Sequence, residues 1–339
     1  MSDVDRGPRN AAEGNALLSD MYRTVLRYGA IRALVSTDCL DQLREGPLSV
    51  TELADRCGLH APTLSRLLRA AAPTGLLRTV SPGTYELTEA GQVLLDGTEL
   101  LRTRWCTVPE VWTSIGELTE TVRSGKSPFV QLHGNTYNFL ATRPEESAAF
   151  DALMVGNHGG VAERVASSGA FPSTGTVVDV GGGKGTFLAA ILRDQPALRG
   201  ILLELERTVD AAREYLTASG VASRCEVVAG DFFKAVPSGA DVYLLASIIH
   251  NWDDDEAADI LRTVRTAIPE HGRLLLVEVV LPDDDSPHPG KDMDIRMLTM
   301  HEGKERSRSE FSALLGDAGF RLDEVTELTR LSLILGTPV

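Results

Sequence analysis

The chain has 339 residues, of which 43% are hydrophobic and 24% charged, so it can bury sizeable cores and is not broadly disordered. Its 48 acidic and 33 basic residues give a formal net charge of −15, which argues against nucleic acid or an anionic membrane surface as a partner. The length fits two domains.

The N-terminus is polar and lacks the apolar segment of a signal peptide. The longest apolar runs fall far short of the ~18 residues that a membrane span needs. Cys39, Cys57, Cys106 and Cys225 are scattered and form no C-x-x-C motif, a pattern typical of reduced thiols rather than disulfides or a zinc site. We therefore expect a cytoplasmic protein.

The first half of the chain is predicted to be helical. We expect residues 1–15 to be a flexible N-terminus, and Ala16–Ile31 to form a helix because its apolar residues recur with a period near 3.6. Further helices are expected as far as Ser168. We predict one domain over residues 16–168, which also contributes to the substrate pocket.

A winged helix is predicted near the start of this domain. Thr51–Cys57 and Pro62–Ala72 form two short helices joined at Gly58, which is a helix-turn-helix pattern. Leu76–Val80 and Thr84–Leu87 follow as a two-stranded wing. The alternatives are DNA binding and a helical interaction module. Between Leu48 and Val80 the sequence has four arginines and two acidic residues, and such a weak basic excess in an acidic chain favours the interaction module.

Strands and helices alternate in the second half, residues 169–339, which we predict to be the catalytic domain. Near-continuous apolar strands separated by helices indicate a doubly wound, mostly parallel sheet of the Rossmann-like kind. A terminal antiparallel hairpin is expected at Leu322–Leu328 and Leu331–Leu335, which lie too close together for a crossover. The other strands are expected at Thr176–Val180, Gly200–Glu204, Cys225–Ala229, Val242–Ala246 and Leu274–Val280.

A glycine-rich turn follows the first of these strands. Gly181, Gly183 and Gly185 are spaced G-x-G-x-G, and Asp179 stands two residues before them. The turn is not a P-loop, and Thr186 breaks the dinucleotide fingerprint. Backbone in such a turn can approach a ligand closely.

Acidic residues end the next two strands. Glu204 is placed to hold both hydroxyls of a ribose, and Asp231 with Phe232 offers a carboxylate and a ring to an adenine. Because parallel strands end at one edge of the sheet, these groups should line one ligand site.

The segments DVGGGKG, LLELE, GDFF and His250-Asn251-Trp252 resemble the S-adenosylmethionine-dependent small-molecule O-methyltransferases of secondary metabolism. The resemblance covers nearly the whole chain and implies S-adenosyl-L-methionine as the cofactor. It implies that the three glycines hold the amino-acid part of the cofactor. The winged-helix segment resembles the family's dimerisation domain, which implies a homodimer. Asp179 and Ser247 complete the predicted cofactor-binding set.

His250 is the candidate general base of an in-line methyl transfer. It ends the fourth strand on the cofactor edge, where its imidazole could accept a phenol proton. Glu278 lies inside an apolar strand, where an unpartnered carboxylate is costly. The resemblance implies that Glu278 and Glu305 flank and orient the imidazole.

The predicted acceptor is an aromatic hydroxyl of a secondary metabolite, a polyketide or another phenolic compound. Some relatives use the fold for cyclisation or hydroxylation, and Asn251 and Ala246 depart from the family pattern, so non-methylating chemistry is the alternative. A cofactor-sensing DNA regulator is a third. Candidate substrate contacts are Met154, Asn157, His158, Asn251, Asp294, Met297 and Met300.

No catalytic metal is predicted. The run Asp253-Asp254-Asp255 precedes a predicted helix, where carboxylates bind free N–H groups and favour the helix dipole.

Overall fold

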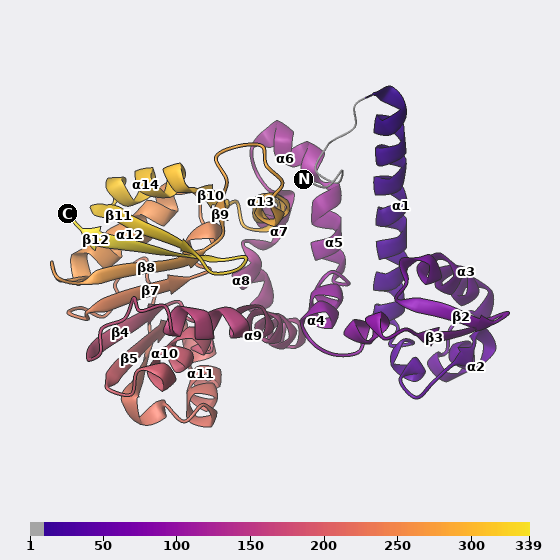
Figure 1. Cartoon of the computed structure of the whole chain (residues 1–339), viewed down its shortest axis with the longest axis horizontal. Helices are drawn as coiled ribbons and strands as arrows, with labels where there is room; N and C mark the ends of the chain where they lie inside the picture. Colours follow the sequence, from indigo (N-terminus) through magenta and orange to yellow (C-terminus); the bar gives the residue numbers. More distant parts are fainter. Residues whose placement is uncertain (1–9) are drawn as a thin grey trace. The chain divides into compact units, whose positions relative to one another are not determined.

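The computed structural model describes residues 10–339, which form two compact units (Figure 1). The first unit ends at Trp112 and the second begins at Thr113. This border lies earlier than the predicted one after Ser168. The reason is that helix α9, Pro144–Ala166, packs along α10, Thr186–Asp194, and adds Val161 and Val165 to a core of the second unit.

The first helix begins inside the segment that was expected to be flexible. Helix α1 spans Ala11–Ser36. The side chain of Asn10 accepts hydrogen bonds from the backbone N–H groups of Ala12 and Glu13, and such an N-cap satisfies donors that the helix leaves free. The remainder of the expected flexible segment, residues 1–9, lies outside the described residues.

The first unit contains the helices and strands that were predicted to form a winged helix. Helices α2 (Val50–Cys57) and α3 (Ala61–Ala71) precede strands β2 (Leu77–Ser81) and β3 (Thr84–Leu87). Strand β1, Leu48–Ser49, joins them in an antiparallel sheet of order β1-β3-β2. The prediction of two helices and a wing is confirmed.

Local sequence signals set the ends of α2. The Ser49 and Glu52 side chains bond each other's backbone N–H groups, which is the reciprocal arrangement of a capping box. Gly58 ends the helix with a φ of 65°, a conformation that glycine adopts at little cost. Leu53 and Leu68 are fully buried and bind the two helices to the core of this unit.

Short helices connect the wing to α9. Among them Pro109–Gly116 crosses the border between the two units. They are α4 (Thr98–Trp105), α5 (Pro109–Gly116), α6 (Leu118–Ser124), α7 (Pro128–His133) and α8 (Thr136–Leu140).

The second unit is built on a seven-stranded sheet of order β11-β12-β8-β7-β4-β5-β6. The five strands from β8 to β6 are parallel, and β12 runs antiparallel to both of its neighbours. This confirms the predicted doubly wound sheet with its terminal hairpin. The strands are β4 (Gly175–Val180), β5 (Leu198–Glu204), β6 (Cys225–Ala229), β7 (Val242–Ala246), β8 (Arg273–Glu278), β11 (Phe320–Glu327) and β12 (Ser332–Pro338).

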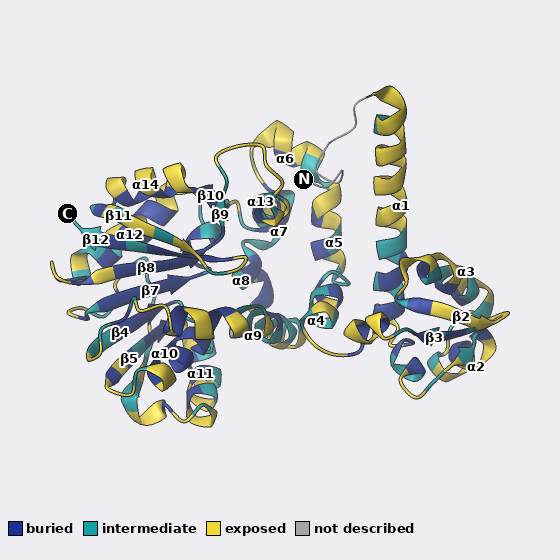
Figure 2. Ribbon diagram, in the orientation of Figure 1, coloured by how far each residue is buried: buried dark blue, intermediate teal, exposed yellow. Residues whose placement is uncertain are grey.

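Helices cover both faces of this sheet and bury two separate apolar clusters. Helices α9, α10 and α11 (Glu206–Ala218) share one cluster with the strands. Helices α12 (Asp254–Ala267) and α14 (Arg308–Asp317) share the other. The central strands are buried along their length, whereas the outer part of α1 is exposed (Figure 2).

Two features beside the carboxyl end of β8 were not predicted as elements. Strands β9 (Val280–Leu281) and β10 (Arg306–Ser307) pair in parallel, and helix α13 (Pro289–Met300) lies between them in sequence. This pairing brings Glu305 next to the end of β8, where Glu278 stands. No helix within residues 10–339 is long and apolar enough to span a bilayer.

Candidate active site

The glycine turn after β4 depends on backbone that other residues rarely adopt. Gly181, Gly183 and Gly185 have φ angles of 69°, 60° and 84°. A Cβ atom at Gly181 would lie 2.8 Å from Ile248 Cδ1 and 3.1 Å from Phe232 Cε1. A Cβ atom at Gly183 would meet nothing within 4 Å. The turn is therefore packed against the ends of two other strands on one side and open at Gly183.

Glu204 at the end of β5 holds this turn in place. Its Oε2 atom accepts a hydrogen bond of 3.0 Å from the Gly183 N–H, and its Oε1 atom accepts one of 2.8 Å from the Leu205 N–H. Burial raises the pKa of this carboxyl, while the two backbone hydrogen bonds lower it. Each oxygen retains a lone pair, so the carboxylate could still accept bonds from a ribose.

Asp179 lies buried beneath the same turn. Neither carboxylate oxygen has a hydrogen-bond partner among the described residues. A Cβ atom at Gly182 would come within 2.2 Å of Oδ2. Burial and the nearby charge of Glu204 raise the pKa of Asp179 to about 7. Unsatisfied acceptors of this kind call for a donor, and the cationic amino group of an amino-acid ligand would fit.

Asp231 and Phe232 follow β6 as the sequence predicted. Asp231 accepts a hydrogen bond from the Phe233 N–H and pairs with Lys234 at 3.0 Å. The rings of Phe232 and Phe233 both meet the edge or face of Trp252, with centroids 6.1 and 4.7 Å away. A cavity of about 520 Å³ opens beside Asp231, between β5, β6 and the following loop. Most of the residues that line this cavity are apolar, which would suit the binding of a flat ring.

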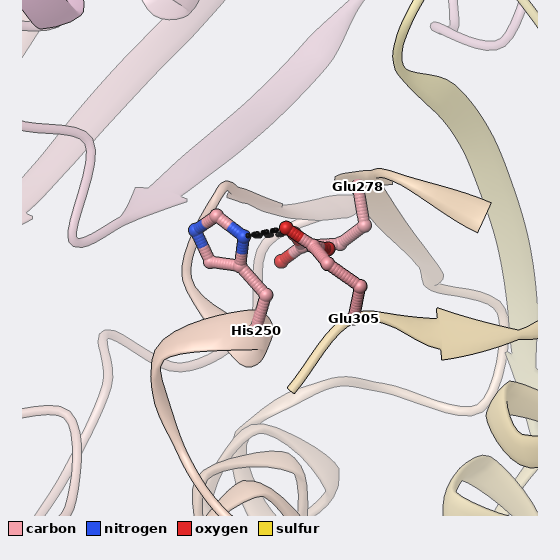
Figure 3. A group of neighbouring side chains, drawn as sticks. All are labelled: His250, Glu278 and Glu305. Atoms are coloured by element: carbon pink, nitrogen blue, oxygen red, sulfur yellow. Dashed lines mark hydrogen bonds and ion pairs between the residues drawn. The ribbon is translucent and has the colours of Figure 1, made fainter. Parts of the chain in front are cut away.

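His250 and two buried glutamates form the centre of the site (Figure 3). His250 lies in a 3-10 turn after β7, Glu278 ends β8, and Glu305 precedes β10. The Nδ1 atom of His250 lies 2.9 Å from Glu305 Oε1 and 3.9 Å from Glu278 Oε2. Both glutamate side chains are fully buried. Since Nδ1 bonds Glu305, Nε2 is the nitrogen left to accept a proton.

The backbone around His250 also binds Glu278. The Oε1 atom of Glu278 accepts hydrogen bonds from the backbone N–H groups of Ile248 and Ile249, at 3.0 and 2.8 Å. The sequence analysis expected the carboxylate of Glu278 to need partners inside its apolar strand, and these two N–H groups are such partners. The Oε2 atoms of Glu278 and Glu305 have no hydrogen-bond partner among the described residues.

These charges shift the protonation of the imidazole. Burial lowers the pKa of His250, but the charges of Glu278 and Glu305 outweigh it and raise the pKa to about 9. Burial in turn raises the pKa of Glu278 to about 7. The three side chains place ligand atoms within 4.8 Å of one another, a spacing that would also suit a divalent ion, so the absence of a catalytic metal stays a prediction.

Arg306 is a site residue that the sequence analysis did not single out. It is fully buried. Its guanidinium donates to the carbonyl oxygens of Ile249 and Trp252, at 3.1 and 3.0 Å, and pairs with Asp254 at 2.9 Å. One buried cation thus holds the backbone on both sides of His250.

A chain of hydrogen bonds joins several predicted contacts. Asn251 Nδ2 donates to the Ser247 carbonyl oxygen at 3.0 Å and to Tyr137 Oη at 3.2 Å. The Ser247 hydroxyl lies 3.2 Å from His158 Nε2, and burial lowers the pKa of His158 to about 4. Tyr137 was missed, because nothing in its local sequence marks it.

The remaining predicted substrate contacts lie on α9 and α13. Met154 and Asn157 are half-buried on α9, and the Asn157 carbonyl accepts a hydrogen bond from Arg330. On α13, Asp294 Oδ1 accepts from the Glu305 N–H at 2.8 Å. Met297 and Met300 are buried, at 5% and 2% exposure, so both core packing and contact with a bound ring remain open to them.

Comparison with known proteins gives matches over nearly the full length. A family model described as O-methyltransferase domain matches residues 115–321, and one described as HVO_A0261 N-terminal domain matches residues 30–107. The phenazine O-methyltransferase PhzM of Lysobacter antibioticus is 36% identical over 303 residues, which cover 88% of this chain and 89% of that protein.

Solved structures agree with the sequence matches. The mitomycin 7-O-methyltransferase MmcR superposes with a TM-score of 0.91 at 32% identity, covering 97% of this chain and 98% of that one. The O-methyltransferase NcsB1 of neocarzinostatin biosynthesis was solved with S-adenosylmethionine and 2-hydroxy-5-methyl naphthoic acid. It superposes with a TM-score of 0.83 at 31% identity, covering 92% and 96% of the two chains.

Proposed function

Since the chain belongs to the O-methyltransferase domain family and is an S-adenosylmethionine-dependent methyltransferase, we propose that it methylates an aromatic hydroxyl of a secondary metabolite with His250 as the general base. The observation that carries this proposal is the hydrogen bond of 2.9 Å between His250 Nδ1 and Glu305. That bond leaves Nε2 as the proton acceptor. Relatives named for a phenazine and a mitomycin support an aromatic natural product as the acceptor.

When bound, the cofactor would supply an electrophilic methyl group, which an acceptor oxygen would attack in line while the sulfur leaves as a neutral thioether. Gly181, Gly183 and Gly185 would hold its amino-acid part, with Asp179 beneath the turn as a partner for the ammonium group. Glu204 would bind the ribose, and Asp231 with Phe232 the adenine. Ile248 and Phe232 both pack against Gly181, which supports one continuous site for the cofactor and the base.

His250 Nε2 would take the proton of the acceptor hydroxyl as the oxygen attacks. Glu305 would accept a hydrogen bond from Nδ1–H and fix the orientation of the ring, as carboxylates do for catalytic histidines elsewhere. Glu278 adds a second buried negative charge that stabilises the imidazolium formed in this step. The proton balance is complete within these three side chains, so the transfer requires no further group to receive it.

Residues around the imidazole would bind the acceptor. We assign this role to Met154, Asn157, His158, Asn251, Asp294, Met297 and Met300, as the sequence analysis did. Asn251, His158 and Tyr137 belong to one hydrogen-bonded chain, and adaptable methionine side chains suit a flat aromatic ring.

Non-methylating chemistry was the alternative because Asn251 replaces an acidic residue beside His250. The amide of Asn251 bonds Ser247 and Tyr137, and the two carboxylates nearest His250 come from β8 and from the segment before β10. The substitution therefore removes no partner of the imidazole, which favours methyl transfer. The net charge of −15 also argues against the third possibility, a DNA-binding regulator.

We also propose a homodimer formed through the first unit, in the cytoplasm. Leucine, methionine, tyrosine and valine side chains form a continuous exposed stripe along α1, and such a stripe marks an interaction surface. Its residues are Leu17, Leu18, Met21, Tyr22, Val25 and Leu26. The described cysteines are all free thiols, which supports a reducing compartment.

Mass spectrometry of the product tests the proposed function directly. The purified protein is incubated with S-adenosylmethionine and a hydroxylated aromatic such as 2-hydroxy-5-methyl naphthoic acid. Methyl transfer adds one CH₂ to the acceptor and converts the cofactor to S-adenosylhomocysteine in equal amount. A modified acceptor that gains no CH₂ while the cofactor stays intact would refute methyl transfer and support the alternative chemistry.

A further inference from the structure

The end of helix α13 carries two buried polar atoms that no part of the mechanism uses. Arg296 Nη2 and His301 Nδ1 are both shielded from solvent, and neither has a hydrogen-bond partner within residues 10–339. Buried polar groups without partners are rare in native proteins, and each calls for an explanation such as a missing ligand. Two such atoms near one helix end suggest that a single ligand group satisfies both.

The His301 ring is held in a defined orientation. Its Nε2 atom lies 3.0 Å from the Thr136 hydroxyl, which is itself buried. The ring of Tyr137 meets it edge-on, with centroids 6.1 Å apart. The subsite uses the tautomer in which the Thr136 hydroxyl donates to Nε2 and the single proton of the neutral ring lies on Nδ1. In that tautomer Nδ1 is a donor aimed away from Thr136.

The two atoms lie beside the catalytic segment. Burial lowers the pKa of His301 to about 3, and the charges of His250 and Arg296 contribute to this lowering. Tyr137, which packs on His301, also bonds Asn251 next to His250. On the same helix, Asp294 accepts from the backbone of Glu305. An acceptor molecule that reaches His250 would therefore lie within range of Arg296 and His301.

Charge determines which ligand group fits. Within the described part of the chain, Arg296 forms no ion pair with a carboxylate, and its buried Nη2 atom has no hydrogen-bond partner. A half-buried guanidinium without a counter-ion favours an anion, and its planar fork matches a carboxylate. A neutral imidazole N–H beside it adds a second donor.

Resting on the proposed function, we propose that Arg296 and His301 form a subsite for a carboxylate carried by the aromatic acceptor, close to the hydroxyl that is methylated. The enzyme is then selective for hydroxylated aromatic acids over the corresponding simple phenols. Met297 and Met300, on the same helix, are buried in the protein interior.

Binding of a matched pair of probes tests the subsite without any turnover. The protein is loaded with S-adenosylhomocysteine and titrated by calorimetry with 1-hydroxy-2-naphthoate and with 1-naphthol, which differ only in the carboxylate. We expect the acid to bind at least about tenfold more tightly, the gain typical of a charge-assisted hydrogen bond. Equal affinities, or no binding of the acid, would overturn the proposal.

Two variants and a matched control assign the preference to the subsite. Arg296→Met removes the cation and should bring the ratio of the two affinities close to one. His301→Phe keeps an aromatic ring against Tyr137 without the donor and should reduce the ratio in part. Lys291→Met removes another cation from α13 and should leave the ratio unchanged. Survival of the preference in Arg296→Met, or its equal loss in Lys291→Met, would overturn the proposal.

The result is separable from that of the proposed function. Titration with S-adenosylhomocysteine alone checks that each variant still folds and binds the cofactor product. Because no methyl donor is present, a protein that fails to methylate could still prefer the acid. Conversely, a methyltransferase that binds both probes equally would retain its proposed function and lose this subsite.

Discussion

The Nδ1 atom of His250 lies 2.9 Å from Oε1 of Glu305, although the two residues are 55 positions apart in sequence. The contact exists because β10 pairs with β9 directly after β8, so that Glu305 and Glu278 approach the imidazole from two segments. The site therefore depends on how accurately the His250 turn and the segment before β10 are held together.

The pH dependence of catalysis should show how strongly Glu278 and Glu305 raise the pKa of His250. The kcat/KM of the wild-type enzyme should rise with pH and level off near pH 9, because the imidazolium present below the raised pKa of His250 cannot accept a proton. Glu305→Gln removes one of the charges that raise this pKa, so its rising limb should shift to lower pH. The kcat profile, measured with saturating cofactor, should also lie at lower pH, because a bound sulfonium opposes protonation. Profiles that superpose for wild type and Glu305→Gln would contradict this account.

Arg306 should be essential for the stability of the His250 turn. Arg306→Met leaves the carbonyl oxygens of three residues and Asp254 without their buried partner, which we expect to lower the free energy of unfolding by about 3 kcal/mol. Denaturant unfolding measures the change. Asp254 is largely exposed, so Asp254→Asn should cost less than about 1 kcal/mol. If both variants lost the same free energy of unfolding, the ion pair with Asp254, and not the contacts to carbonyl oxygens, would account for the stabilisation by Arg306.

Gly303 tests how closely the two segments must approach. A Cβ atom there would lie 2.1 Å from the His250 carbonyl oxygen, so Gly303→Ala must push the segment away from the turn. We expect a loss of about 1–3 kcal/mol of stability and at least about a tenfold loss in kcat, since misplaced catalytic groups are costly. Gly316→Ala is the control, because nothing lies within 4 Å of the new methyl group. An unchanged kcat in Gly303→Ala would show that catalysis tolerates a larger separation between the Gly303 segment and the His250 turn.

The exposed stripe on α1 should form the dimer interface. Leu18 and Tyr22 are each 66% exposed, and Leu18→Glu combined with Tyr22→Glu should convert a dimer to a monomer in sedimentation velocity. Arg23→Glu changes the charge on the other side of the helix and should leave the dimer intact. A wild-type monomer at micromolar concentration, or a dimer that survives both glutamates, would contradict the proposal.

Much of the fold was predictable because it follows from local periodicity. The winged-helix elements agree to within a residue or two, since Gly58 and the Ser49 cap fix the ends of α2. The glycine turn, Glu204 and Asp231 could be placed at one sheet edge because parallel strands share their carboxyl ends.

The rest depends on pairings that leave no local signal. Arg306 stands among charged residues in the sequence, yet the β9–β10 pairing buries it completely. Tyr137 meets Asn251 across 114 positions. The early start of α1 was missed because its first turns are exposed on nearly all sides and show no one-sided apolar pattern.

Replacement of His250 tests the central claim most directly. His250→Ala is assayed for methyl transfer with a labelled cofactor, and its affinity for S-adenosylhomocysteine is measured in parallel. We predict that kcat falls by about 10²- to 10⁴-fold, the range typical of a lost general base, while the affinity for S-adenosylhomocysteine changes little. Near-full turnover in His250→Ala would contradict the assignment of His250 as the base.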